Sequence, residues 1–249
     1  MIYLSGDIHG DVNRVSRDIG KYGITKNDII ILLGDVGLNF IGFEKSRMRK
    51  EFLNCFGIPI FCIHGNHEIR PETLPSYYEK VWHGGIVYVE DSYPNLLFAK
   101  DGELFDLDGY ITLVIGGAYS VDKYYRLSHG YPWFADEQPY DVIKKRVESN
   151  LEAHGWIVNI VLSHTCPKKY IPTEAFLPGL DQSNVDRSTE KWLGKIEEKL
   201  TYGDWYCGHW HIDKRVDKVH FMMYSYETLS PMKPCRRLRI MLSRLMRKK

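Results

Sequence analysis

Histidine, aspartate and asparagine recur in short motifs along this chain, most of them next to glycine. The motifs are Asp7-Ile8-His9, Gly34-Asp35, Gly65-Asn66-His67-Glu68, an isolated His164, and Gly208-His209-Trp210-His211. They combine oxygen donors with imidazole nitrogens and contain no thiolate. This donor set suits a borderline divalent metal such as Mn, Fe or Zn better than Ca or Mg. The glycines beside Asp35, Asn66 and His209 fit tight turns through which short side chains can converge.

The number of these donors exceeds what one metal ion needs. Two ions about 3.5–4 Å apart that share a bridging carboxylate would use all of them, and such a centre hydrolyses phosphate esters. The candidate metal ligands are Asp7, His9, Asp35, Asn66, His164, His209 and His211.

An apolar run precedes each motif. Residues 2–4, 28–33, 58–63, 157–162 and 205–207 are therefore predicted to be buried strands that end in the polar motifs. Residues 11–22 and 44–56 have helical character, and helices between strands are typical of a parallel sheet. In an open α/β sheet, ligands bind at the carboxyl ends of the strands.

The rest of the chain supplies further elements. We expect short strands at 85–89, 96–100, 103–106 and 111–115 to form a second, more antiparallel sheet. The spacing of apolar residues predicts helices at 141–154 and 187–200, with Gly155 ending the first of them. Residues 214–219 and 221–226 are predicted to pair as a hairpin.

All five motifs, in this order and each after an apolar strand, resemble the signature blocks of the calcineurin-like metallophosphoesterase family. The blocks run from residue 7 to residue 211 and so cover most of the chain. The resemblance implies the fold class α/β, a four-layer α/β/β/α sandwich in which two mixed β-sheets are flanked by helices. It places the metals at one edge of the sheets.

The resemblance also implies a role for each site residue. Asp35 would bridge two divalent ions, and His67 would be a catalytic residue that faces the leaving group as a general acid or stabiliser of charge. The nucleophile would be a metal-bound hydroxide that attacks phosphorus in line. The ligands of one metal would be Asp7, His9, Asp35 and His211, and those of the other Asp35, Asn66, His164 and His209.

One departure from the family pattern bears on the substrate. The protein serine/threonine phosphatase branch continues after its Gly-Asp with Asp-Arg-Gly, whereas this chain has Val36-Gly37-Leu38-Asn39-Phe40 after Asp35. We therefore expect a phosphomonoester or phosphodiester of a small or nucleotide-like molecule as the substrate. The alternatives are a protein serine/threonine phosphatase and a catalytically silent scaffold or binding protein on the same fold.

The aromatic-rich stretch 116–126 offers candidate substrate contacts. Arg126 could bind phosphate because a guanidinium takes two phosphate oxygens at once, and Arg70 is the second choice. Tyr119 and Tyr125 could stack on a base or another flat group. The alternative is that this stretch only packs over the core.

Composition favours one large domain followed by a tail. The chain has 249 residues, of which 44% are hydrophobic and 26% charged, enough for a substantial core. We expect residues 1–231 to form a single metallophosphoesterase domain and residues 232–249 a separate tail. Neither a signal peptide nor a transmembrane segment is recognised, and the five cysteines form no C-x-x-C pair. These features favour a cytoplasmic protein with free thiols.

The tail is strongly basic. Residues 232–249 hold eight of the 33 lysines and arginines and no acidic residue, so the body keeps 25 basic against 32 acidic residues. Leu238, Met241, Leu242 and Leu245 have helical spacing, which predicts an amphipathic helix that could contact an anionic partner such as nucleic acid or a lipid surface. A frayed terminus is the alternative.

Overall fold

The first apolar segments of the chain form the centre of a parallel sheet. In this computed structural model, which describes residues 1–40, 42–176, 178–179 and 181–231, β1 (Ile2–Ser5), β2 (Ile29–Leu32) and β3 (Ile60–Cys62) pair in parallel. Every residue of these three strands is buried. Strands covered on both faces need such unbroken apolar sequences, which explains why the sequence pattern identifies them.

Two mixed sheets are built around such parallel centres. The seven-stranded sheet has the order β13 (Glu227–Leu229), β1, β2, β3, β6 (Leu96–Ala99), β5 (Gly85–Val89) and β4 (Tyr78–Trp82). The six-stranded sheet has the order β11 (Lys214–Val216), β12 (Val219–Phe221), β10 (Asp204–Cys207), β9 (Ile160–Ser163), β8 (Tyr110–Ile115) and β7 (Leu104–Leu107). Antiparallel strands lie at the edges of both sheets.

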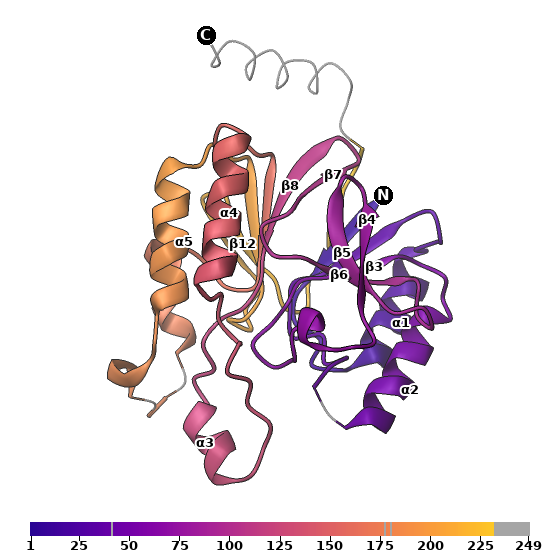
Figure 1. Cartoon of the computed structure of the whole chain (residues 1–249), viewed down its shortest axis with the longest axis horizontal. Coiled ribbons are helices and arrows are strands. Elements are labelled where there is room, and N and C mark those ends of the chain that lie inside the picture. The colour runs from indigo at the N-terminus through magenta and orange to yellow at the C-terminus, as the bar shows by residue number, and fades with distance from the viewer. Residues whose placement is uncertain (41, 177, 180, 232–249) are drawn as a thin grey trace.

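Helices cover the outer face of each sheet (Figure 1). On one side lie α1 (Val12–Tyr22) and α2 (Phe43–Asn54), and on the other lie α4 (Asp141–Ala153) and α5 (Ser188–Lys199). The short α3 (Lys123–Ser128) projects from the body on the long connection between β8 and α4. The fold class predicted from the resemblance, a four-layer α/β/β/α sandwich, is confirmed.

Three clusters of apolar side chains fill the spaces between the four layers of helices and sheets. Alternate residues of a strand point to opposite faces, so each sheet contributes to two of these clusters. Ile31 and Leu162 belong to the cluster between the sheets, which contains side chains from both of them. Ile30 packs under α1 and α2, while Val161 packs under α4 and α5.

The predicted helices agree with the observed ones to within one or two residues at each end. Asp11 caps α1, since its side chain accepts a hydrogen bond from the backbone N–H of Arg14, and Gly23 ends the helix in a left-handed conformation. Gly155 follows α4 with a φ of 66°, as predicted. The helix positions are therefore determined by local signals.

The prediction of a separate antiparallel sheet over residues 85–115 is wrong in one respect. β6 pairs in parallel with β3, and β5 pairs with β6, so these two strands extend the first sheet. The turn at Asp101-Gly102 then carries the chain across to β7 and β8 in the second sheet. The four residues of β6 are all buried, which explains why this strand belongs inside a sheet and not at an edge.

The predicted hairpin is also shorter than expected. β11 and β12 pair as an antiparallel hairpin, but residues 222–226 do not continue it as a strand. The Asp213 carboxylate accepts hydrogen bonds from the backbone N–H groups of Met223, Tyr224 and Ser225. This carboxylate satisfies the donors that a strand partner would otherwise bind.

No helix within the described ranges is both long and apolar enough to cross a membrane. The described cysteines Cys55, Cys62, Cys166 and Cys207 are free. The basic tail, and with it the predicted amphipathic helix, lies outside the described residues.

Candidate metal centre

The residues predicted to bind metal all lie just beyond the ends of parallel strands. Such ends meet at one edge of each sheet, and the two sheets present these edges side by side. The candidate ligands follow β1 (Asp7, His9), β2 (Asp35) and β3 (Asn66) in the first sheet, and β9 (His164) and β10 (His209, His211) in the second, while the predicted catalytic His67 comes directly after Asn66.

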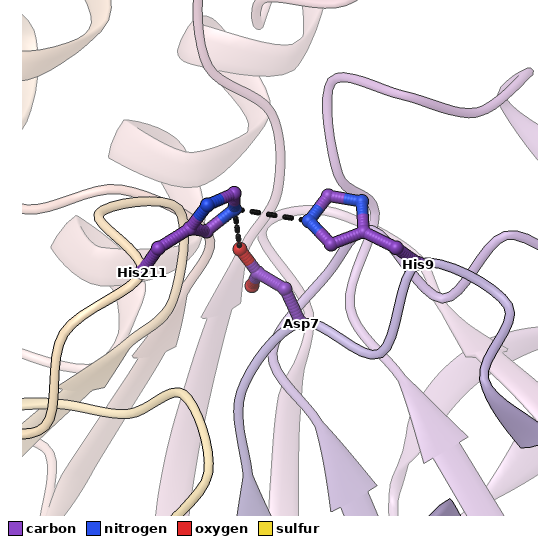
Figure 2. Close-up of side chains that lie close together, drawn as sticks. All are labelled: Asp7, His9 and His211. Carbon is purple, nitrogen blue, oxygen red and sulfur yellow. Dashed lines mark hydrogen bonds and ion pairs between the residues drawn. The ribbon is translucent and has the colours of Figure 1, made fainter. Parts of the chain in front are cut away.

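A first cluster joins Asp7, His9 and His211 (Figure 2). The Nε2 atoms of His9 and His211 lie 2.9 Å apart, and Nε2 of His211 lies 3.3 Å from Oδ2 of Asp7. Asp7 is buried at the base of the cluster, whereas both histidines are exposed. The cluster therefore opens to solvent on its imidazole side.

A second cluster joins Asn66, His164 and His209. Oδ1 of Asn66 lies 2.8 Å from Nε2 of His164 and 3.0 Å from Nδ1 of His209. Asn66 and His164 are fully buried. Burial also lowers the pKa of His209 well below its usual value, which favours the neutral imidazole that metals bind.

Asp35 contacts a histidine of each cluster. One of its carboxylate oxygens lies 4.0 Å from Nδ1 of His9, and the other lies 3.6 Å from Nε2 of His164. Burial acts to raise the pKa of Asp35, but the neighbouring histidines outweigh it and lower that pKa to about 2. Asp35 is therefore a carboxylate anion placed between the two clusters.

The spacing of these donor atoms fits metal coordination. Two ligands on one ion, with bonds of about 2.1 Å, are separated by about 3 Å at octahedral angles and by about 3.4 Å at tetrahedral angles. The closest donor pairs in the two clusters are 2.8–3.3 Å apart. Divalent ions of the borderline type could therefore occupy both clusters without a large rearrangement of these pairs.

Neighbouring backbone groups orient the candidate ligands. Nδ1 of His164 lies 2.8 Å from the carbonyl oxygen of Leu33, which leaves Nε2 directed at Asn66 and Asp35. The backbone N–H of His67 donates to Asp35, and that of His209 donates to Asp7. Metal ligands are commonly fixed by such outer contacts.

The backbone is strained where the site residues stand. His9, Asp35, His209 and His211 have φ values of 45°, 46°, 67° and 53°. Side chains other than glycine rarely adopt this left-handed region, and such strain concentrates at functional sites. The tertiary structure therefore holds these four residues in conformations that their local sequence disfavours.

Three glycines of the motifs make room for the donors. A Cβ atom on Gly34 would lie 2.1 Å from Nδ1 of His164, and one on Gly208 would lie 2.1 Å from Oδ1 of Asp7. At Gly65 it would meet Asp35 at the same distance. The prediction that these glycines allow the side chains to converge is confirmed.

His67 stands beside both clusters. One of its ring nitrogens lies within 4.8 Å of donor atoms of His9 and Asp35, so distance alone would admit it as a ligand. On its other contacts, Nε2 lies 3.8 Å from Oδ1 of Asp122, and the ring stacks on Phe40 at 6.1 Å between centroids. Burial lowers the pKa of His67, with the Asp35 charge acting in the opposite direction.

Arg126, the predicted phosphate contact, shares two neighbours, Asp122 and Phe40, with His67. It is 4% exposed, its Nε lies 3.8 Å from Oδ2 of Asp122, and its guanidinium lies 5.0 Å from the ring centre of Phe40. Nη1 has no hydrogen-bond partner in the part of the chain that the structure describes. Arg70 is placed differently, since its guanidinium forms a buried ion pair with Asp101 at 2.6 Å.

The two predicted stacking tyrosines are separated in the structure. Tyr119 is buried and lines a pocket that His209 and His211 also line. Tyr125 is 58% exposed on α3, where its ring stacks on His129 and Tyr131, and it does not line that pocket.

Sequence reasoning missed several residues beside the candidate centre. Asp122 contacts His67, while Phe176, Arg187 and Trp210 line the pocket next to His209. The position of Trp210 near the site could have been predicted, because this residue stands inside the Gly-His-x-His motif. Asp122 and Phe176 lie in connections without a recognisable pattern, and Arg187 stands at the start of a predicted helix, so only the fold brings these three residues to the site.

A known protein family matches most of this chain. A family model described as Metallophos, calcineurin-like phosphoesterase, matches residues 1–213. Among solved structures, a phosphopantetheinyl hydrolase from Mycobacterium tuberculosis matches at 15% identity and a TM-score of 0.46, over 89% of this chain and 87% of that chain. A comparison with curated protein sequences finds no match.

Proposed function

The chain belongs to the calcineurin-like phosphoesterase family and is a phosphoric ester hydrolase, and we propose that it works through a dinuclear metal centre. Members of this family bind divalent metal ions. The proposal rests on the position of Asp35, whose carboxylate lies between two separate clusters of candidate metal ligands. One carboxylate in this position can serve two ions.

The proposed ligand sets follow the two clusters. In each set Asp35 completes three donors that already lie together. One ion would be held by Asp7, His9, Asp35 and His211, and the other by Asp35, Asn66, His164 and His209. Manganese, iron and zinc are the candidate metals, since oxygen and imidazole donors are mixed without thiolate.

In the proposed reaction, each side chain near the metal centre has its own role. When bound, the two ions supply a nucleophile from water at neutral pH and withdraw charge from the phosphoryl oxygens. His67 donates a proton to the leaving-group oxygen or stabilises its charge. Arg126, whose Nη1 is unpartnered among the described residues, supplies a positive charge beside His67. Phe40 holds the His67 ring by stacking.

The proposed substrate is a small-molecule or nucleotide-like phosphoester. The segment that replaces the Asp-Arg-Gly of protein phosphatases contributes Val36 and Leu38 to the apolar core. This segment has no cation to clamp a phosphoserine, which favours smaller substrates over phosphoproteins. A scaffold without catalysis is disfavoured, because every donor position is filled and His67 lies beside them.

A substrate panel tests the proposal. The purified protein is supplied with Mn²⁺ and compared on nucleotides, sugar phosphates and phosphopeptides by release of phosphate, and on cyclic nucleotides by formation of the nucleoside monophosphate. We expect two metal equivalents per chain and the highest kcat/KM on a nucleotide-like ester. Turnover that survives complete removal of metal would contradict the proposal, and a preference for phosphopeptides would contradict the substrate class.

A further inference from the structure

A pocket of about 170 Å³ opens beside the candidate metal centre. His209 and His211 form part of its wall, so a group held there would sit next to a phosphate at the metals. We call it the side pocket and define it by five more of its lining residues, Tyr119, Phe176, Arg187, Glu190 and Trp210.

The size and the walls of the side pocket suit one flat ring. Pockets that enclose whole ligands measure about 300–1,000 Å³, so this smaller space fits a single part of a substrate. The rings of Phe176 and Trp210 stack at 6.2 Å between centroids and 27° between planes, and the buried ring of Tyr119 borders the same space. Such aromatic surfaces bind flat rings by stacking.

Arg187 adds hydrogen-bond donors to this wall. Its guanidinium lies 5.0 Å from the ring centre of Phe176, and Nη2 donates to Oε1 of Gln182 at 2.9 Å. A guanidinium carries five N–H donors in one plane. The bond to Gln182 therefore leaves donors that can reach a ligand resting on the aromatic wall.

Glu190 adds an acceptor. It is 3% exposed, and Oε1 accepts a hydrogen bond from Oγ1 of Thr165 at 2.9 Å. Oε2 is buried and has no hydrogen-bond partner within the described ranges. Burial raises the pKa of the Glu190 carboxyl, and the Arg187 charge acts in the opposite direction. Buried polar atoms normally have partners, so an N–H group of a ligand would satisfy this oxygen.

We infer that the side pocket binds the base of a nucleotide substrate. The base stacks on Phe176 and Trp210, one of its N–H groups donates to Glu190, and an adjacent acceptor receives an N–H of Arg187. Nucleobases are read in proteins by this combination of stacking with hydrogen bonds to the Watson–Crick edge. Sugar phosphates and phosphoserine peptides have no flat ring of this kind. The inference rests on the proposed phosphoesterase function and narrows its substrate class.

Paired substrates test the inference. Arg187→Ala and Glu190→Gln are compared with the native protein on nucleoside monophosphates, on cyclic nucleotides and on glycerol phosphate, which has no ring. Arg17→Ala, an exposed arginine on α1, is the matched control. We expect KM for the best nucleotide to rise at least about tenfold in both variants, because each loses a hydrogen bond to a charged group. Glycerol phosphate turnover should be nearly unchanged.

Nucleoside binding separates this inference from the proposed function. Free nucleosides carry no phosphate and are titrated into the metal-loaded protein by calorimetry, where binding should be weakened by Arg187→Ala and Glu190→Gln but not by Arg17→Ala. If nucleosides do not bind, or both kinds of substrate respond equally to the variants, the side pocket does not bind bases even though hydrolysis stands. If nucleosides bind but no ester is hydrolysed, the proposed function fails while the base site stands.

Discussion

Nε2 of His67 lies 3.8 Å from Oδ1 of Asp122, a carboxylate from the connection between β8 and α4. Asp122 Oδ1 is buried and has no hydrogen-bond partner among the described residues. On its other oxygen Asp122 faces Nε of Arg126 at 3.8 Å. A carboxylate beside a functional histidine orients the ring and favours its protonated form. The usual Asp-Arg segment is absent after Asp35, and Asp122 with Arg126 brings the same two side-chain types to His67 from another part of the chain.

Asp122→Asn should slow hydrolysis in a way that depends on the leaving group. An alkyl ester needs a proton from His67, so its kcat should fall by about 10–100-fold, the usual effect of losing a partner that orients a histidine. The leaving group of a nitrophenyl ester, nitrophenolate, departs without a proton, so kcat for this ester should fall much less. The exposed Asp91→Asn is the control. Equal losses on both esters, or loss of metal, would show that Asp122 acts through the fold and not through His67.

His67→Ala should keep both metals and lose most turnover. General acid help is worth about 10²–10⁴-fold, so kcat should drop within this range. The measurement pairs elemental analysis with kcat, and His129→Ala provides an exposed histidine as control. Elemental analysis is needed because a ring nitrogen of His67 lies near His9 and Asp35, where it could also bind a metal ion. Metal loss from a folded His67→Ala protein would make His67 a ligand and overturn its catalytic role.

Gly34→Ala should destabilise the protein and disturb the site together. The new Cβ would lie 2.1 Å from Nδ1 of His164, at a φ of 100° that alanine disfavours. We expect a loss of at least about 1–3 kcal/mol in the free energy of unfolding, measured by urea denaturation. Gly20→Ala is the matched control, since nothing lies within 4 Å of its Cβ position in α1. It should stabilise by about 0.5–1 kcal/mol. Equal stabilities for the two variants would contradict the close packing at Gly34.

The convergence of most candidate metal ligands can be predicted from the sequence, because most of them stand in a short motif that follows a strand. Asp7, Asp35 and Asn66 each follow a strand whose apolar residues are consecutive, and such a pattern depends on neighbours in the chain. The converging geometry follows once these strands are parallel, as observed. Prediction is reliable here because strand, turn and donor are encoded within about ten residues.

The parts that sequence reasoning missed depend on distant contacts. Asp122 has no motif around it, and its position beside His67 results from the path of the connection after β8. β4 also escaped prediction, because it is an edge strand whose residues are mostly exposed and charged or polar at its centre. β13 has three residues and is ordered by pairing with β1. Such elements are selected by tertiary context, which outweighs local preference.

Metal stoichiometry of Asp35→Asn and His211→Ala tests the central claim, a dinuclear centre bridged by Asp35, most directly. Asp35 contacts His9 of one cluster and His164 of the other. His211 contacts Asp7 and His9, which both belong to the first cluster. Elemental analysis of the purified, folded variants should therefore show both ions lowered together in Asp35→Asn and about one ion lost in His211→Ala. An Asp35→Asn protein that keeps one full equivalent of metal would contradict the bridge.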